Sequence, residues 1–360
     1  MTWTPDDREQ VLRAARRDAV LFDMAHRGLL EVGGSDRTRW LDGMISNDVP
    51  ALERRSSGAG CEALLLTNRG AIVADLHVGR LDEVYLLEGE REELPRIHAT
   101  LERFVIADDV TIRDRSAEQA ALGLEGPLAP AVLEGLLAGR AAIPAEDDWL
   151  ATEIEGVPLL VAAFGWSGEG AYQLRVPADR RAQLEGWLDQ SARRVVGGGA
   201  RLLRGDLAAL EVLRVEVGIP RLGAELDEDV LPPEARLDRA IATRKGCYVG
   251  QEIVARLRSR GQVNHLLVGL RLEPGPGAAA PIPSETPVFV DGRRTGELTS
   301  VVDSPRAGAI ALGFVRREHA EPGTRVELEG GLGAAIVSEL PFVPPASPTP
   351  RPEAPAAGPA

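Results

Sequence analysis

The chain has 360 residues, 44% of them hydrophobic, so it can bury two or three cores without disulfides or metals. A formal charge of −14 with no long basic run excludes the electrostatic footprint of a nucleic-acid-binding protein. The only cysteines, Cys61 and Cys247, favour a reducing compartment. The first residues lack a signal-peptide pattern, and no apolar run approaches the roughly 18 residues of a membrane span. We therefore expect a soluble, cytoplasmic protein with no nucleic-acid or membrane partner.

The first two thirds of the chain mix helical and strand patterns. Thr4 and Pro5 predict a helix that continues to about Arg17, and a strand at 29–32 precedes a helix that Ser35 caps. Two apolar runs around a turn at 68–70 predict a β-hairpin formed by residues 61–66 and 72–78. Further strands are expected near residues 85–87, 110–114, 121–124, 150–162 and 171–176, and helices near 90–104, 128–138, 178–194 and 206–217. This mixture predicts an α+β fold.

The character of the sequence changes after about residue 252. Apolar, β-rich runs separated by Gly, Pro and Asp-Gly turns predict a small all-β barrel or sandwich, with runs at 252–258, 264–272, 286–290, 296–302, 308–315 and 324–338. A linker rich in Pro, Gly and Ala is expected at 273–285. The last 20 residues hold eight of the 26 prolines and little to bury, which predicts a disordered tail.

Several kinds of functional motif are absent from the sequence. There is no glycine-rich phosphate loop followed by Lys, no dinucleotide fingerprint after a strand, and no HExxH or CxxC. The five histidines are scattered, so we expect no resident metal site. Two cysteines cannot supply the four thiolates that usually hold an iron-sulfur cluster. If such clusters are involved, the chain acts on or for another protein.

The segment 244–252, Arg-Lys-Gly-Cys-Tyr-Val-Gly-Gln-Glu, concentrates rare residues. Lys245 is the only lysine against forty arginines, and it lies two residues from Cys247 and three from Tyr248, one of three tyrosines. Ammonium is a compact, titratable charge, whereas guanidinium is a broad fork, so a position that keeps Lys uses that difference. Nearby positive charge favours a thiolate, which predicts a reactive Cys247; the alternative is a small buried filler.

The octapeptide KGCYVGQE, residues 245–252, resembles the signature of the YgfZ-type folate-binding proteins, which are similar to the T-protein (aminomethyltransferase) of the glycine cleavage system. Weaker resemblances cover most of the chain, at residues 18–24, 45–48, 64–70, 124–127, 167–174 and 214–220. The resemblance implies a three-domain cloverleaf around a folate-binding cavity, with a C-terminal β-barrel. The expected domains are 1–262, an α+β folate-binding region of two interleaved domains; 263–343, the barrel; and 344–360, the proline-rich tail.

The resemblance also implies a set of functional residues. Glu169, Arg214 and Glu216 match positions that line the T-protein folate pocket, where a carboxylate can bind a pterin edge and an Arg the glutamate tail. Trp166 is a candidate to stack on the pterin, with a core or rim role as the alternative. The cofactor set is completed by residues of the octapeptide, namely Tyr248, Gln251 and Glu252. The implied cofactor is tetrahydrofolate or another reduced folate.

Three functional hypotheses follow. The first is a tetrahydrofolate-binding accessory factor for iron-sulfur cluster assembly or repair, which works through Cys247 and Lys245 and has client enzymes or assembly proteins as partners. The second is a folate-dependent aminomethyltransferase or demethylase. The T-protein carries a catalytic Asp just ahead of a helix, whereas the stretch 86–94 here offers only glutamates, so the second hypothesis assigns acid-base work to one such as Glu93. The third is a non-catalytic interaction scaffold.

Overall fold

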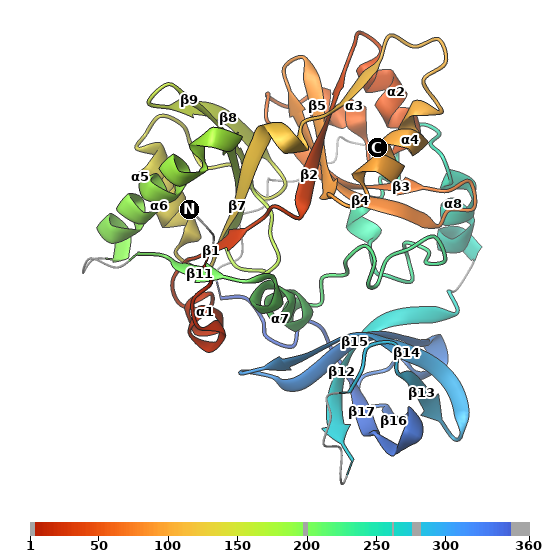
Figure 1. Cartoon of the computed structure of the whole chain (residues 1–360). Coiled ribbons are helices and arrows are strands. Elements are labelled where there is room, and N and C mark those ends of the chain that lie inside the picture. The colour runs from red at the N-terminus through yellow and green to blue at the C-terminus, as the bar shows by residue number, and fades with distance from the viewer. Residues whose placement is uncertain (1–3, 197–200, 261–262, 276–281, 347–360) are drawn as a thin grey trace, which may run out of the picture.

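The computed structural model describes residues 4–196, 201–260, 263–275 and 282–346. The chain forms three lobes, each built on its own β-sheet (Figure 1). Two α+β lobes stand side by side, and a closed six-stranded barrel lies below them (Figure 1). The predicted α+β cloverleaf with a C-terminal barrel is therefore confirmed.

One lobe is a five-stranded sheet whose buried face packs against three helices. The strand order is β3 (Gly60–Leu66), β4 (Ile72–Leu81), β5 (Val84–Glu90), β2 (Arg27–Gly33) and β6 (Thr111–Asp114). The helices are α2 (Arg37–Met44), α3 (Val49–Glu53) and α4 (Leu94–Glu102). β3 and β4 pair antiparallel, as the predicted hairpin requires. This lobe brings one face of β4 toward the second lobe.

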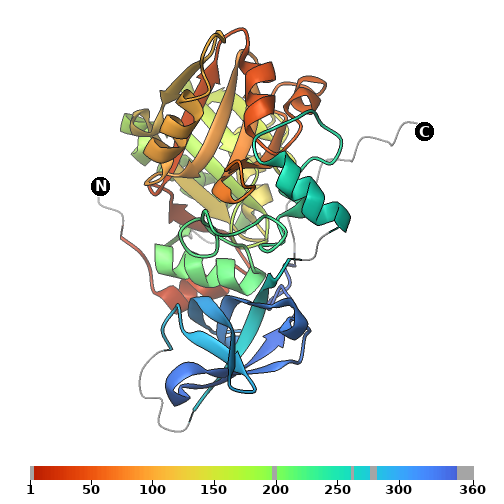
Figure 2. The same ribbon diagram turned by 90° about the vertical axis from the view of Figure 1, so that its right-hand side faces the viewer.

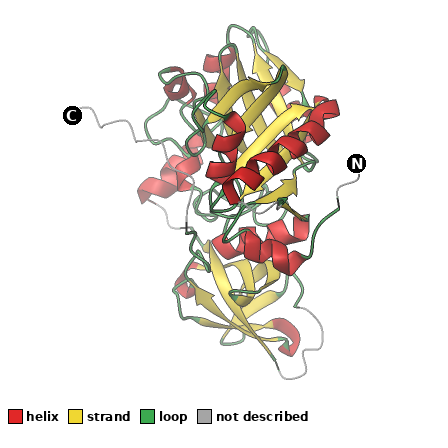
Figure 3. Cartoon of the chain, turned by 90° about the vertical axis from the view of Figure 1, so that its left-hand side faces the viewer, coloured by secondary structure: helices red, strands yellow, loops and turns green. Residues whose placement is uncertain are grey.

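The second lobe is a six-stranded sheet covered by α5 (Ala129–Leu137) and α6 (Arg181–Val196) (Figure 3). Its strand order is β11 (Leu203–Gly205), β1 (Val20–Asp23), β7 (Gln119–Glu125), β10 (Ala171–Pro177), β9 (Val157–Ala162) and β8 (Trp149–Ile154). The single strand predicted at 150–162 is two strands, because Glu155 and Gly156 turn the chain with φ of 51° and 77°. β1 was not predicted. It is inserted so that Val20 pairs with both Glu125 and Leu203.

Two helices lie between the sheets and the barrel (Figure 1). α1 (Arg8–Ala14) is capped by Asp7 rather than Thr4, because an Asp7 carboxylate oxygen accepts from the backbone N–H of Gln10 at 3.0 Å. α7 (Leu207–Val217) is capped by Asp206 and ends at Gly218, whose left-handed φ of 86° lets its N–H bond the Arg214 carbonyl at 2.9 Å. This cap turns the chain sharply after α7, where residues 217–221 reach the cavity described below.

The barrel closes through β12 (His265–Pro274), β15 (Gly308–Arg316), β14 (Arg293–Ser304), β13 (Pro287–Val290), β16 (Arg325–Leu328) and β17 (Gly333–Ser338). The β-rich prediction for 252–258 is wrong. These residues belong to helix α8 (Gln251–Arg260), which projects from the side of the molecule (Figure 2). An apolar run this short is compatible with the repeat of a helix and with that of a strand. Here Ile253, Val254 and Leu257 recur at helical spacing.

The remaining elements are short 3-10 turns at Ser116–Glu118, Ala178–Arg180, Asp238–Ala240, Arg317–His319 and Glu329–Gly331. Among the described residues, no helix has the length and apolar character needed to cross a bilayer. Part of the predicted linker, 276–281, and most of the predicted disordered tail, 347–360, lie outside the described residues.

Candidate functional site

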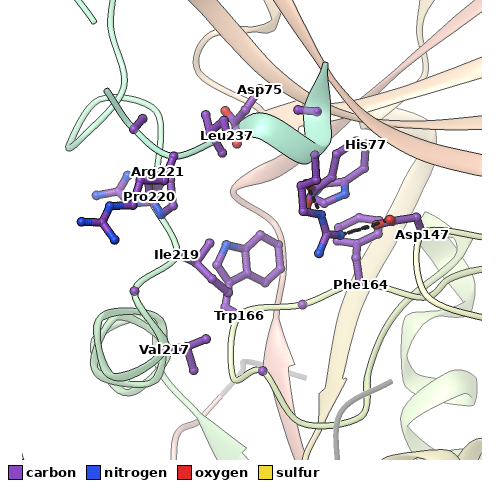
Figure 4. Close-up of a pocket in the computed structure, with 18 of the residues that line it drawn as sticks. Asp75, His77, Asp147, Phe164, Trp166, Val217, Ile219, Pro220, Arg221 and Leu237 are labelled. Carbon is purple, nitrogen blue, oxygen red and sulfur yellow. Dashed lines mark hydrogen bonds and ion pairs between the residues drawn. The ribbon is translucent and has the colours of Figure 1, made fainter. Parts of the chain in front are cut away.

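A cavity of about 490 Å³ lies where the two sheets, the end of α7 and the C-terminal segment meet (Figure 4). In Figure 4, Trp166 lies in the middle, with Ile219 and Pro220 on one side and Phe164 and His77 on the other. A volume of this size suits a ligand of drug or cofactor dimensions.

Strand β4 supplies the polar wall of the cavity. Asp75 and His77 are two residues apart on a strand and therefore project from the same face. Glu62 of β3 is paired directly with His77, and all three residues line the cavity. The hairpin register thus places two carboxyl groups and an imidazole side by side.

Asp75 has the environment expected of an acid-base group. Within the part of the chain that the structure describes, its Oδ1 is buried and has no hydrogen-bond partner. Burial raises the pKa of Asp75 above its ordinary value, while the positive charge of Arg27 acts in the opposite direction. A carboxyl group that faces a cavity with a raised pKa and a free oxygen is a candidate for proton transfer.

Aromatic rings form the apolar surface of the cavity. Phe164 and His77 stack with ring centroids 3.6 Å apart and planes 4° from parallel. Trp166 meets Phe164 edge-on at 6.1 Å, and the Arg27 guanidinium lies 5.0 Å from the Trp166 ring centroid. Burial lowers the pKa of His77 to about 3, so its imidazole is neutral at pH 7. The rings and the neutral imidazole together offer a flat apolar surface.

One end of the cavity is acidic. Arg239 binds Glu62 at 2.7 Å, Glu146 at 3.0 Å and Asp147 at 3.1 Å. Burial raises the pKa of Glu62 to about 7, against the lowering effect of Arg239. Glu62, His77 and Asp147 each place a ligand atom within 4.8 Å of the others. Because the Arg239 guanidinium already pairs with the carboxyl groups of both Glu62 and Asp147, we assign no metal to this cluster.

Two of the residues implied by resemblance line the cavity, Glu169 and Trp166. Glu169 is only 2% exposed and is already engaged by Arg16 at 3.4 Å and by the backbone N–H of Ala346 at 3.0 and 3.1 Å. Trp166 is 6% exposed and lies in the middle of the cavity (Figure 4).

Arg214 and Glu216 are not among the described residues that line the cavity. Arg214 is 1% exposed and holds the barrel in place by donating to Glu225 at 2.8 Å and to the Ser300 hydroxyl at 2.7 Å. Glu216 accepts from Arg16 at 2.6 Å and from the Ser304 hydroxyl at 2.5 Å. Both residues lie on α7 and bond serine hydroxyls of the barrel. Their charges are already paired, with Glu225 and Arg16 respectively.

The octapeptide folds as a loop against the C-terminal end of α2. The Lys245 ammonium donates to the backbone carbonyls of Asp42, Ile45 and Asn47 at 2.7, 2.8 and 2.7 Å. It also pairs with the Asp42 carboxylate at 2.9 Å, and its side chain is 1% exposed. Burial lowers the pKa of Lys245, although Asp42 opposes this. An ammonium has three N–H donors, so three convergent carbonyls explain why this one position keeps lysine.

The other residues of the octapeptide are distributed around this anchor. Cys247 is exposed, and the Tyr248 ring is buried in the core with its centroid 5.1 Å from the Lys245 nitrogen. Gln251 and Glu252 begin α8. Of the described residues that line the cavity, none belongs to the octapeptide. Tyr248, Gln251 and Glu252 therefore lie outside the cavity, and Cys247 does not line it either.

The glutamates of 86–94 are also absent from the described lining of the cavity. Glu88 is buried and paired with Arg27 at 2.7 Å, and Glu93 precedes α4, where it binds Arg96 at 2.7 Å. Glu93 therefore does not lie among the described residues of the cavity, and its acid-base role stays a prediction. Asp75, Glu62 and Arg239 are the residues that sequence reasoning missed. A signal was present, because Asp75 and His77 interrupt an apolar strand on one face.

Comparison with known proteins matches nearly the whole chain. Residues 4–245 match the family described as GCVT N-terminal domain, and residues 266–344 match the glycine cleavage T-protein C-terminal barrel domain. The chain belongs to the glycine cleavage T-protein family. An aminomethyltransferase of Rubrobacter xylanophilus is 33% identical over 331 residues, which cover 91% of this chain and 84% of that protein. One of Cutibacterium acnes is 32% identical over 343 residues, covering 91% and 88%.

A solved T-protein has the same architecture. The crystal structure of glycine cleavage system aminomethyltransferase T from Bartonella henselae superposes with a TM-score of 0.79 at 25% identity. The match covers 94% of this chain and 90% of that one. The T-protein fold thus extends through both α+β lobes and the barrel.

Proposed function

We propose that the chain binds tetrahydrofolate in the central cavity and transfers a folate-linked one-carbon unit, with Asp75 as the acid-base group. The observation that carries the proposal is the buried Asp75 carboxyl group, which lines a cavity of cofactor size in a member of the T-protein family. The curated relatives are named aminomethyltransferases, which supports transfer of an aminomethyl group as the reaction class.

The cavity has the features that a reduced folate needs. A pterin is flat and carries amino and N–H donors along one edge, which suits the surface of Phe164 and Trp166 beside carboxyl groups. The glutamate tail of folate is anionic. Arg221 lines the cavity, so its guanidinium can bind that tail.

Asp75 supplies the proton transfer that the reaction requires. When a secondary amine of reduced folate forms a bond to the transferred carbon, that nitrogen loses one proton, and the bond from the carbon to its leaving group breaks with the electron pair. A carboxylate within reach accepts the proton. The raised pKa of Asp75 makes it a stronger base than an exposed carboxylate.

Tetrahydrofolate is expected to stabilise the native chain. Saturation at about 100 times the dissociation constant adds roughly 2.7 kcal/mol, because the unfolded chain has no cavity to bind it. Thermal unfolding with and without the ligand measures this as a rise in Tm. Phe164→Ala removes part of the aromatic surface and should reduce the rise, whereas Ile106→Ala, at a side chain 87% exposed and outside the cavity, should keep it. No rise in Tm and no calorimetric binding would remove the folate proposal.

A second function is favoured by the octapeptide. We propose that the YgfZ-type motif KGCYVGQE gives the folate-binding chain a further role in keeping iron-sulfur enzymes active, with Cys247 as the working thiol. Cys247 is exposed, and Lys245 fixes the loop that presents it. In a strain that lacks the protein, Cys247→Ala should then fail to restore iron-sulfur enzyme activity while Asp75→Asn restores it. If Cys247→Ala restores iron-sulfur enzyme activity, the thiol is not required, and one-carbon transfer remains as the only proposed function.

The two cysteines are expected to differ in reactivity. Cys61 is partly buried in β3, and burial raises the pKa of its thiol well above the ordinary value, so it stays protonated at neutral pH. Cys247 is exposed and should be alkylated first. Timed alkylation followed by peptide mass spectrometry measures both rates, with Cys247→Ser as the control that removes the fast site. Equal rates in the native protein would contradict this assignment.

A further inference from the structure

The C-terminal segment 340–346 closes one end of the cavity. Leu340, Pro341 and Pro345 line the cavity together with Gly168 and Glu169. The fit is close at both walls of this end. A Cβ at Gly218 would lie 2.7 Å from Leu340, and one at Gly168 would lie 3.6 Å from Pro345. This segment, called the strap below, is thus a wall of the cavity that comes from beyond the barrel.

The strap is held in two different ways. Phe342 and Val343 are 8% and 5% exposed and pack against Val215 and Leu267, so this half is anchored in a hydrophobic core. The Val343 N–H also donates to the Glu216 carbonyl at 3.2 Å. The anchored half is therefore part of the rigid interface between α7 and the barrel.

The other half depends on one donor. Residues 344 and 345 are prolines and have no N–H, so in the described part of the strap Ala346 carries the next backbone donor after Val343. That donor bonds both carboxylate oxygens of Glu169, at 3.0 and 3.1 Å. Glu169 also pairs with Arg16, so its charge remains compensated if Ala346 departs.

We propose that the strap is a gate to the folate cavity and that the bond from the Ala346 N–H to Glu169 is its latch. When the latch breaks, the stiff Pro344–Ala346 unit pivots on the anchored Phe342 and Val343 and uncovers the end of the cavity beside Gly168 and Gly218. The ligand enters and leaves through this opening. The gate rests on the proposed function, because it governs access to the proposed folate site.

The test compares Ala346→Pro, which removes the N–H and also fixes the backbone at this position, with Ala346→Gly, which keeps the N–H. A hydrogen bond to a charged acceptor is strong enough to change an opening equilibrium by roughly tenfold. Stopped-flow binding of tetrahydrofolate should show association and dissociation both about tenfold faster in Ala346→Pro, with little change in Kd, and native rates in Ala346→Gly. A chain that ends after Pro345, compared with one that ends after Ala346, repeats the test without a substitution.

The outcomes separate the gate from the folate site. If Ala346→Pro and Ala346→Gly share the native rates, the strap is not the route of access and the proposal is overturned. Faster dissociation with unchanged association also overturns it, because the strap is then a fixed wall that contacts the ligand. Failure of the native chain to bind tetrahydrofolate removes the proposed function itself, which the native measurement alone decides.

Discussion

Asp75→Asn is expected to lower the rate of folate-dependent one-carbon transfer about 10²- to 10⁴-fold, the range found for the loss of a general acid or base. Asn has nearly the same shape, so the cavity keeps its form and tetrahydrofolate should bind with its native Kd. The measurement is product formation from an aminomethyl donor and tetrahydrofolate, together with calorimetric binding. A loss of rate without a loss of binding would assign proton transfer to the Asp75 carboxylate.

The pH dependence of the same reaction gives a second test. Because burial raises the pKa of Asp75, its basic form is lost on acidification at a higher pH than for an exposed Asp. The native rate should therefore fall as pH decreases through that raised pKa, and Asp75→Asn should lack this limb. The matched control is Glu93→Gln, a side chain 37% exposed and outside the cavity. Native activity in Asp75→Asn with loss in Glu93→Gln would return the role to Glu93.

Lys245→Arg is expected to lower the free energy of unfolding by about 1–3 kcal/mol, the usual cost of leaving buried polar groups unsatisfied. The Lys245 side chain is 1% exposed and donates to three carbonyls. A guanidinium is planar and cannot aim three donors at carbonyls that converge on one point. Urea unfolding measures the change.

The neighbouring residue provides the control for this variant. Arg244 is exposed, so Arg244→Lys exchanges the same two residue types without a buried contact and should unfold at the native denaturant concentration. Lys245→Ala should cost more than Lys245→Arg, about 3–5 kcal/mol, because it leaves Asp42 without its buried partner. If Lys245→Arg and Arg244→Lys unfold at the same urea concentration, the ammonium is not required by the three carbonyls.

Most elements of the fold were predictable because local patterns set them. Two apolar runs around a turn marked the hairpin of β3 and β4, and the change of character after about residue 252 marked the barrel, although it was placed within α8. β1 escaped prediction because Val20–Asp23 is short, and its strand character comes from partners distant in sequence. α8 was mistaken for strand because apolar runs of this length fit both periods.

The functional site was less predictable, because it depends on which side chains the tertiary fold brings together. Lys245 and Cys247 were predicted as working groups because they are rare in the sequence and belong to the octapeptide. The Lys245 ammonium is instead buried and holds the loop against α2. Asp75 is one of many acidic residues in the sequence. Only the register of β4 against β3, with the loop that carries Phe164 and Trp166, turns it toward a cavity. The resemblance implied a ligand role for Arg214, and its contact with Ser300 could not be foreseen because that partner belongs to the barrel, far along the chain.

The position of β1 between β11 and β7 in the six-stranded sheet affects how the chain is made. Val20 leaves the ribosome early, but one of its ladder partners, Glu125, is synthesised much later, and the other, Leu203, later still. The five-stranded sheet needs only residues up to β6, so it can assemble while β1 is still unpaired. An apolar Val-Leu-Phe segment is therefore exposed during translation until the second lobe is complete. In this interval we expect the exposed segment to be a site where the nascent chain can misassociate.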